Sequence, residues 1–456
     1  MTETALAFDG KPWMLRIPGQ KDMVLVSSPE GVEEIYGATN ADKFPKGEFQ
    51  IDNLTVMFGH SVVNSDGSRW FHQRKAAAKF FTAKSLRTCM TSNMQKNVLQ
   101  MFEVLDASIV SQKSFNLGRL FHEFALQTFC EVGLGVDLRW IGSDEPNPLE
   151  HAMEVSTVAL LRRFRLPVLY WHTLRYLNVS SERHMAEAME SVREWIRNVI
   201  NKSLAATTSK SQADSSAPKS VMELFLEQSQ ENTEGMGPED LVDFILTFVI
   251  AANDTSAVAL TWFFLLMTKY PAVERKIRDE MAAVLPAMGV TQDTYLTTDH
   301  TQRLVYLEAT IKEVLRLYPP VPLTERQASE DTVIAGNTFI RKGTMVGVSP
   351  YTMARLPSVW GPDAAEFKPE RWIDPESGAM RAIPSTQFPT FSSGPRTCIG
   401  MKLAMLELRV AAANLLHRYE FNLAQPNDGS YVVATGLSLK HPLIIKATRR
   451  SEAMGA

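Results

Sequence analysis

Hydrophobic positions recur at helical spacing through most of the chain. Between residue 68 and about residue 280 they repeat at three- and four-residue steps, which predicts a series of long helices. Before residue 70, short apolar runs at 13–17 and 23–26 are separated by turn residues, which predicts a small sheet. Between residues 318 and 374, proline and glycine divide further strand-like pieces. The pattern therefore predicts a mainly α chain with small β-sheets.

A Ser/Ala/Thr-rich stretch at about 205–218 interrupts the helical pattern. It predicts a surface loop rather than a domain linker, because the composition does not shift across it and the flanking helices need one another to bury their apolar faces. No internal repeat is visible. We expect one domain over 1–456, with a β-rich part at 1–67, a helix-rich part at 68–317, and strands, a cysteine-containing turn and a C-terminal helix and strands at 318–456.

The most apolar stretch, residues 244–267, raises the question of a membrane span. Asn253 and Asp254 interrupt it near its middle. The uncharged run on either side is then shorter than the ~20 apolar residues that a spanning helix needs. We therefore expect a buried helix that carries a functional acid.

Composition excludes several classes of function. The chain has 456 residues, 45% of them hydrophobic, and a formal net charge of -4 without a basic tract, so nucleic acid is not an expected partner. Its nine histidines show no HExxH spacing and no glycine loop matches a nucleotide fingerprint, so zinc hydrolase and nicotinamide dehydrogenase functions lack support. Three cysteines, Cys89, Cys130 and Cys398, cannot form a disulfide framework and fit a reducing, cytosol-facing compartment.

One of these cysteines lies in a glycine-rich turn at 391–400, directly before the helix expected at 401–419. A lone cysteine is more often a small core residue, but a thiolate at the start of a helix gains from the helix dipole and from free N–H groups, which should lower its pKa. Gly394 and Gly400 should let the backbone turn sharply, and Arg396 supplies a cation close by. The surroundings therefore favour Cys398 as an iron ligand.

This turn, with the pattern FxxGxRxCxG, resembles the haem-binding signature of the cytochrome P-450 (haem-thiolate monooxygenase) superfamily. The resemblance covers nearly the whole chain. It implies a helix-rich triangular prism with small sheets, in which haem lies between a long central helix and the helix after Cys398. It also implies that Glu313 and Arg316 of an ExxR helix form a buried network with Arg371 of the PERW segment, and that this network fixes the cysteine turn.

Asp254 and Thr255 fit the acid–alcohol pair of this family, which supplies protons for oxygen activation. Ala252 stands where the family most often has glycine, and its methyl group should narrow the helix groove without closing it. A structural alternative remains open, in which Thr255 bonds back to a helix carbonyl and Asp254 caps a kink.

The resemblance also implies a set of residues that hold haem b. Trp70 and Arg74 look like the family's WxxxR helix, and Arg326 and Arg396 would complete a cationic cage for the two haem carboxylates, although each could be an ordinary surface or core residue. Ala251 matches a position where some animal fatty-acid hydroxylases carry a glutamate that esterifies haem, so we expect non-covalent binding. The expected cofactor-binding set is Trp70, Arg74, Arg326, Phe391, Gly394, Arg396, Cys398 and Gly400.

Residues 66–76, 248–255 and 260–264 are similar to the plant and fungal clan of fatty-acid and alkane hydroxylases. This similarity implies a long apolar channel and a lipophilic substrate. The family's substrate-contact regions map onto 49–58, 155–164, 248–255, 321–324 and 436–438. Apolar side chains there are equally compatible with an ordinary core.

We therefore expect a monooxygenase that inserts one oxygen atom from O2 into a C–H bond, with electrons from NADPH through a separate flavoprotein reductase. The basic residues expected at the docking surface are Arg69, Lys75, Lys79, Lys84 and Arg87. A haem-thiolate hydroperoxide isomerase or dehydratase and a non-catalytic haem-binding protein stay open as alternatives. No membrane anchor or signal peptide precedes the first predicted strand, so we expect a cytoplasmic protein, or one at the endoplasmic reticulum membrane if an anchor is missing.

Overall fold

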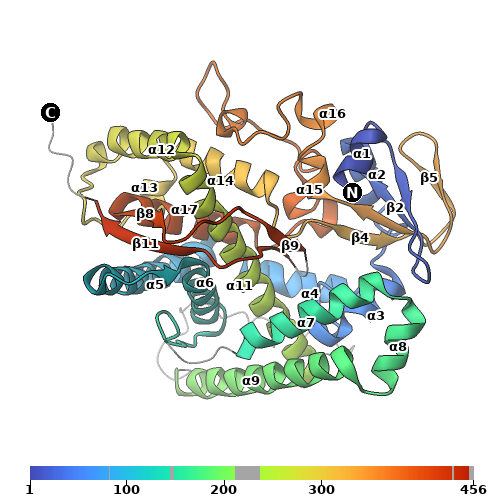
Figure 1. The fold of residues 1–456 in the computed structure, drawn as a ribbon. Coiled ribbons are helices and arrows are strands. Elements are labelled where there is room, and N and C mark those ends of the chain that lie inside the picture. The colour runs from blue at the N-terminus through green and yellow to red at the C-terminus, as the bar shows by residue number, and fades with distance from the viewer. Residues whose placement is uncertain (82, 144–147, 211–236, 434–435, 451–456) are drawn as a thin grey trace.

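A computed structural model describes residues 1–81, 83–143, 148–210, 237–433 and 436–450. Most of them lie in helices, and one long helix, α11 (Pro238–Lys269), runs through the middle of the molecule (Figure 1). The other α-helices are α1 (Thr2–Ala7), α2 (Pro29–Tyr36), α3 (Gly47–Phe58), α4 (Gly67–Phe80), α5 (Ala83–Ser111), α6 (Leu117–Leu134), α7 (Pro148–Arg165), α8 (Val168–Tyr176), α9 (Ser180–Lys210), α12 (Pro271–Val284), α13 (Thr298–Thr301), α14 (Val305–Leu317), α15 (Pro350–Met353), α16 (Pro357–Trp360) and α17 (Met401–Arg418).

The strands form small sheets at two sides of the helical body (Figure 1). One sheet has the order β1 (Trp13–Leu15), β2 (Met23–Val26), β7 (Met345–Val348) and β4 (Thr324–Gln327), and only the β2–β7 pair is parallel. Another has the order β3 (Phe115–Asn116), β11 (Ile444–Arg449) and β8 (Tyr419–Leu423). Two antiparallel pairs complete the set, β5 (Thr332–Ile334) with β6 (Thr338–Ile340) and β9 (Tyr431–Val433) with β10 (Leu437–Leu439).

Local sequence sets the ends of several helices. The side chain of Asn116 caps α6 by accepting a hydrogen bond from the Arg119 N–H, and Gly135 ends that helix with a φ of 69°. Pro238 stands in the first turn of α11, where no intrahelical N–H is needed. These residues fix where the two most closely packed helices of the core begin and end.

Helix α11 is the core helix of the protein. Within the described residues it is the one helix long and apolar enough to cross a membrane, yet 72% of its apolar window is buried inside the protein. It packs against α6, α14 and α17, and Trp262, Phe263 and Leu265 are fully buried in these contacts. The prediction of a buried helix carrying an acid is confirmed.

Two other sequence predictions, the β-rich part at 1–67 and the loop at 205–218, are wrong in part. The runs at 13–17 and 23–26 do form strands, but 1–67 also contains helices α1, α2 and α3, so describing this part as β-rich was wrong. Helix α9 continues to Lys210, so the predicted loop at 205–218 is wrong for its first residues, and 211–218 lie outside the described residues. The helix continues through 205–210 although their composition is typical of loops, because α9 is already nucleated and each further residue adds one backbone hydrogen bond.

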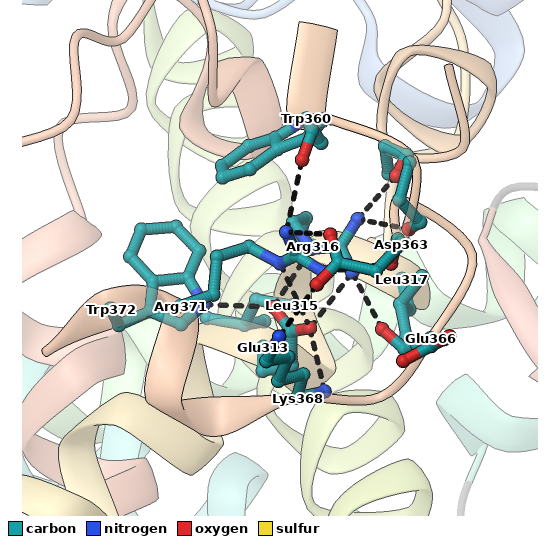
Figure 2. Close-up of polar contacts among 12 residues, drawn as sticks. Glu313, Leu315, Arg316, Leu317, Trp360, Asp363, Glu366, Lys368, Arg371 and Trp372 are labelled. Carbon is teal, nitrogen blue, oxygen red and sulfur yellow. Dashed lines mark hydrogen bonds and ion pairs between the residues drawn. The ribbon is translucent and has the colours of Figure 1, made fainter. Parts of the chain in front are cut away.

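A buried ion network joins α14 to the segment before the cysteine turn (Figure 2). Arg316 donates to both carboxylate oxygens of Glu313 at 2.7 and 2.8 Å, and both side chains are almost completely buried. Arg371 lies 3.5 Å from the same carboxylate, and Trp372 Nε1 donates to it at 2.9 Å. One carboxylate therefore receives four side-chain N–H groups from three residues.

The remaining guanidinium N–H groups hold the chain that leads to the cysteine. Arg316 donates to the carbonyl oxygens of Ala364 and Glu366 at 2.7 and 3.0 Å. Trp372, in the short 3-10 helix η2 (Pro369–Trp372), packs edge-on against Phe388, which directly precedes η3 (Pro389–Phe391). The network thus fixes a rigid path from α14 to the residues that open the cysteine turn.

Candidate active site

A cavity of about 300 Å³ lies between α11 and the turn that precedes α17. Cys398 forms part of one wall, and α11 residues form another. Most of the lining is apolar, and four cations occupy it as well. The lining residues that the argument uses are Lys46, Val62, Val63, Trp70, Arg74, Phe129, Phe248, Ala251, Ala252, Thr255, Ser256, Arg326, Phe391, Arg396, Cys398, Gly400 and Glu407.

The cysteine turn is held by its own backbone. The Cys398 N–H donates to the Phe391 carbonyl at 2.8 Å, across the 3-10 helix η4 (Gly394–Arg396). Gly394 has a φ of 63°, and a Cβ there would lie 1.8 Å from the Tyr36 carbonyl oxygen, so only glycine fits. Gly400 has an ordinary φ of -83°, and a Cβ there would touch Cys398 Sγ at 3.9 Å. The structure therefore requires glycine at position 394, as expected, but not at position 400.

The Cys398 side chain is exposed to the cavity. Burial raises the pKa of the thiol, while N–H groups of Gly400 and Met401 and the nearby Arg74 oppose the rise. The prediction that the helix start would leave this thiol with a lowered pKa was wrong for the protein without a bound metal, because desolvation outweighs the N–H groups. Those N–H groups do point at the sulfur, as a metal-bound thiolate requires.

Three arginines and a tryptophan from distant segments meet at one edge of the cavity. Arg396 donates to Asp66 at 2.7 Å, and its guanidinium lies 3.9 Å from the centre of the Trp70 ring. Arg74 donates to the Thr397 carbonyl at 2.6 Å, which ties α4 to the cysteine turn. Arg326, on β4, is buried beside the Tyr36 ring. The structure thus brings together the four residues that the sequence singled out for carboxylate binding.

Sequence reasoning missed a fourth cation at this edge, Lys46. It precedes α3, lines the cavity, and has its pKa lowered well below the usual range, first by burial and then by Arg326 and Arg396. Glu325 lies behind it, and burial raises the pKa of that carboxyl to about 7. A single lysine in front of a predicted helix carries no signal by itself, so only the fold could place it here.

The charges around the cavity do not balance. Four cations line it, Lys46, Arg74, Arg326 and Arg396, and within the described part of the chain only Arg396 forms an ion pair. Glu407 is the one acid in the lining. Asp66 and Glu325 offset part of this charge, and the remaining surplus of buried cations favours an anionic ligand at this edge. A flat apolar macrocycle with two carboxylates and a metal that accepts a thiolate fits the cations, the apolar walls and Cys398 together.

Small side chains of α11 line the wall that faces the cavity. Ala251, Ala252, Thr255 and Ser256 are all in the lining. Thr255 donates its hydroxyl to the Ala251 carbonyl at 2.7 Å, which is the local bond that the structural alternative expects. Because the hydroxyl donates its hydrogen in this bond, its oxygen can still accept a hydrogen bond from another group.

Asp254 lies elsewhere on α11. It is absent from the cavity lining, and a Cβ on Gly436 would lie 3.2 Å from its Oδ2. Burial raises the pKa of its carboxyl, and the charge of His122 opposes the rise. Asp254 and Thr255 are therefore adjacent in sequence but face different surroundings.

A second acid near the cavity, Glu407 of α17, also went unnoticed in the sequence. It is buried, and Ser256 donates to its Oε2 at 2.8 Å. Burial raises its pKa to about 8, so it is mostly protonated at neutral pH. It ties α11 to the helix that follows Cys398.

The expected substrate-contact regions meet the cavity only in part. Residues from 248–255 and 321–324 line it, whereas no residue of 49–58, 155–164 or 436–438 does. Val62, Val63 and Phe129, which the sequence did not single out, supply apolar walls instead. Among the residues expected at the docking surface, Arg69 pairs with Asp240 at 3.7 Å, and the side chains of Lys84 and Arg87 lie outside the described ones.

Comparison with known proteins agrees with this geometry. The family profile described as Cytochrome P450 matches residues 8–445. The chain is 31% identical to cytochrome P450 94B1 of Arabidopsis thaliana, over 94% of this chain and 82% of that protein. It is 29% identical to cytochrome P450 86B1 of Arabidopsis thaliana, over 96% and 79%. It is 30% identical to the cytochrome P450 monooxygenase cyp1 of Mycosarcoma maydis, over 95% and 69%.

Proposed function

Because the chain belongs to the cytochrome P450 family, and is thus a haem-thiolate monooxygenase, we propose that Cys398 is the ligand that holds its haem b. When bound, haem b with a thiolate ligand supplies the activation of O2, which needs two electrons from NADPH through a reductase and two protons. One oxygen atom enters a C–H bond of the substrate and the other leaves as water. The observation that carries the assignment is Cys398 in the wall of a cavity with surplus cations.

The cations at the cavity edge would hold the two haem carboxylates. Arg74, Arg326 and Arg396 present planar forks that suit carboxylates, and Trp70 packs under Arg396 and fixes its orientation. Lys46 adds a point charge to this cage. Ala251 offers no group that could form an ester, which supports non-covalent binding. Phe391, Gly394 and Gly400 shape the turn around Cys398.

We propose an apolar substrate such as a fatty acid or an alkane. Val62, Val63, Phe129 and Phe248 form apolar walls of the cavity, and similarity to plant and fungal relatives supports a lipophilic substrate. Incubation of the purified enzyme with reductase, NADPH and a panel of fatty acids, alkanes and sterols tests this. We expect NADPH-dependent hydroxylated products from the first two classes. Turnover of a fatty-acid hydroperoxide without NADPH or O2 would instead assign an isomerase or dehydratase.

Thr255 and Asp254 are proposed to supply protons. Thr255 lines the cavity, and its hydroxyl oxygen can accept a hydrogen bond from a bound water while it donates to Ala251. Asp254 is the preceding residue of α11. In Thr255→Ala, product formed per NADPH should fall by about 10-fold and hydrogen peroxide should rise, because proton transfer by a positioned group is worth at least that much. Haem content should stay unchanged.

Thr261→Ala is the matched control for this variant. Thr261 also belongs to α11 and donates to its own helix, at 2.7 Å to the Ala257 carbonyl, but it does not line the cavity. It should keep normal coupling of NADPH use to product. Equal loss of coupling in both variants would assign the effect to helix packing and would remove Thr255 from the proton path.

We propose that the reductase docks beside α4. Arg74 ties this helix to the cysteine turn, and Lys75 is exposed and Lys79 partly exposed on it. Lys75→Glu with Lys79→Glu should slow haem reduction by the reductase, most at low ionic strength, because opposite charges steer association and salt screens them. Stopped-flow formation of the reduced CO complex measures this rate.

Hydrogen peroxide bypasses the reductase, so peroxide-driven turnover of the double variant should be spared. Lys342→Glu with Lys440→Glu makes the same change in net charge at two exposed lysines away from α4, and should leave the reduction rate unchanged. Equal losses with NADPH and with peroxide would show damage to the haem site and would reject docking at α4.

We also propose that the chain works as one haem domain facing the cytosol, where a reducing environment keeps Cys398 a free thiol before it binds haem. If the gene product carries a membrane anchor, we propose that the same domain lies at the endoplasmic reticulum membrane and faces the cytosol. Fractionation of cells that express the complete gene product tests both placements.

A further inference from the structure

Asp254 is absent from the cavity lining, and α6 places a histidine beside the residue that precedes it on α11. His122 Nδ1 lies 3.4 Å from the side-chain oxygen of Asn253, the residue before Asp254. Helices α6 and α11 pack closely here, since a Cβ on Gly118, one turn before His122, would lie 3.3 Å from Thr261 Oγ1. His122 itself is only partly buried, so its ring reaches from the helix contact toward solvent.

A glycine, which has no titratable side chain, approaches the Asp254 carboxyl. Gly436, before β10, approaches its Oδ2, and a Cβ on that glycine would also lie 3.0 Å from the Pro320 carbonyl. On α6, the neighbouring charges Arg119 and Glu123 pair with each other at 2.9 Å. Electrostatically, His122 is the group that acts on Asp254 within the described residues.

We propose that His122 is the residue through which Asp254 exchanges protons with solvent during turnover, an inference that rests on the proposed proton-supplying role of Asp254. The imidazolium of His122 gives one proton to the Asp254 carboxylate, leaving neutral imidazole and a carboxylic acid. The imidazole then takes a proton from solvent, and the acid gives up its own proton in the proton-supplying role proposed for it. Imidazole suits this task because it gains and loses a proton near neutral pH more readily than any other unperturbed side chain. His122 is a positioning and proton-supplying residue and does not touch the cavity.

His122→Gln is the central test, because glutamine can keep the contact with Asn253 but has no proton to exchange. With reductase, NADPH and a substrate found by the panel, we expect turnover to fall by about 10-fold, and the solvent deuterium isotope effect on turnover to rise, because proton supply becomes slow. Peroxide-driven turnover should stay normal, since hydrogen peroxide already brings the two protons and two electrons. Arg119→Gln, one turn earlier on α6, is the control and should change neither quantity.

The double variant His122→Gln with Asp254→Asn separates this inference from the role of Asp254. If both residues serve one path, the double variant should lose no more than Asp254→Asn alone, because residues that act as a unit are not additive. Additive losses in the double variant would overturn the role of His122 but not that of Asp254. The same conclusion would follow if Asp254→Asn is impaired while His122→Gln keeps an unchanged isotope effect. Normal turnover in Asp254→Asn would instead remove the proposed role of Asp254. Peroxide-driven turnover lost in His122→Gln would assign His122 a purely structural role and would likewise overturn the proposal.

Discussion

Cys398→Ser is expected to abolish monooxygenase activity and the strongly red-shifted Soret band of the reduced CO complex. That band is produced by a thiolate ligand, and a serine hydroxyl in the same turn cannot supply one. The turn itself should survive, because the backbone bond from the residue 398 N–H to the Phe391 carbonyl and the left-handed φ of Gly394 do not involve sulfur. A difference spectrum of the dithionite-reduced, CO-treated protein measures the outcome.

Cys130→Ser is the matched control for this experiment. Cys130 is fully buried in α6, where burial raises the pKa of its thiol, and it does not line the cavity. The variant should keep the red-shifted band, even if a hydroxyl in the core lowers stability. A variant Cys398→Ser that retained both haem and the band would contradict the assignment of the iron ligand.

Glu313→Gln is expected to have the largest effect on stability. The carboxylate of Glu313 is fully buried and receives Arg316, Arg371, Trp372 and the Lys368 N–H. An amide removes the negative charge and leaves buried Arg316 without a counter-ion, which costs about 3–5 kcal/mol. Urea unfolding of the haem-loaded protein, followed by tryptophan fluorescence, should show this loss, and haem should be released more easily because the path to the cysteine turn loosens.

An ion pair exposed to solvent provides the control for Glu313→Gln. Glu187 accepts from Arg183 at 2.8 Å on α9, and both side chains are more than half exposed. Glu187→Gln should leave the unfolding curve unchanged within error, because water screens such pairs. If Glu313→Gln were as mild as Glu187→Gln, the network would not be what fixes the segment between α14 and the cysteine turn.

Much of the site was predictable from local sequence. The turn at 391–400 encodes its own conformation, since Gly394 meets the Tyr36 carbonyl and Phe391 accepts the Cys398 N–H. The spacing of Glu313 and Arg316 places both on one face of α14, and the helix start after Gly400 follows from periodicity. The polar break at Asp254 indicated a buried helix rather than a membrane span. Each of these depends on residues a few positions apart.

Other features were not predictable for a physical reason. Lys46, Glu407 and His122 have no distinctive neighbours in sequence, and the fold brings each of them to a residue far along the chain: Arg326, Ser256 and Asn253 respectively. The helix content of 1–67 was missed because short amphipathic helices resemble loops between strands at this length. The pKa of Cys398 was misjudged because burial cannot be read from helix position.

The sequence by itself therefore determined the cysteine turn, the ion-pair helix and the long core helix, because short-range spacing and backbone chemistry specify them. Its resemblance to a known family pointed to the arginines at the cavity edge. Only the tertiary structure decided that Lys46 joins those arginines, that Asp254 is absent from the cavity lining, and that burial raises the pKa values of Cys398 and Glu407. Electrostatic energies depend on distance and desolvation, and both quantities exist only once segments far apart in the chain have packed together.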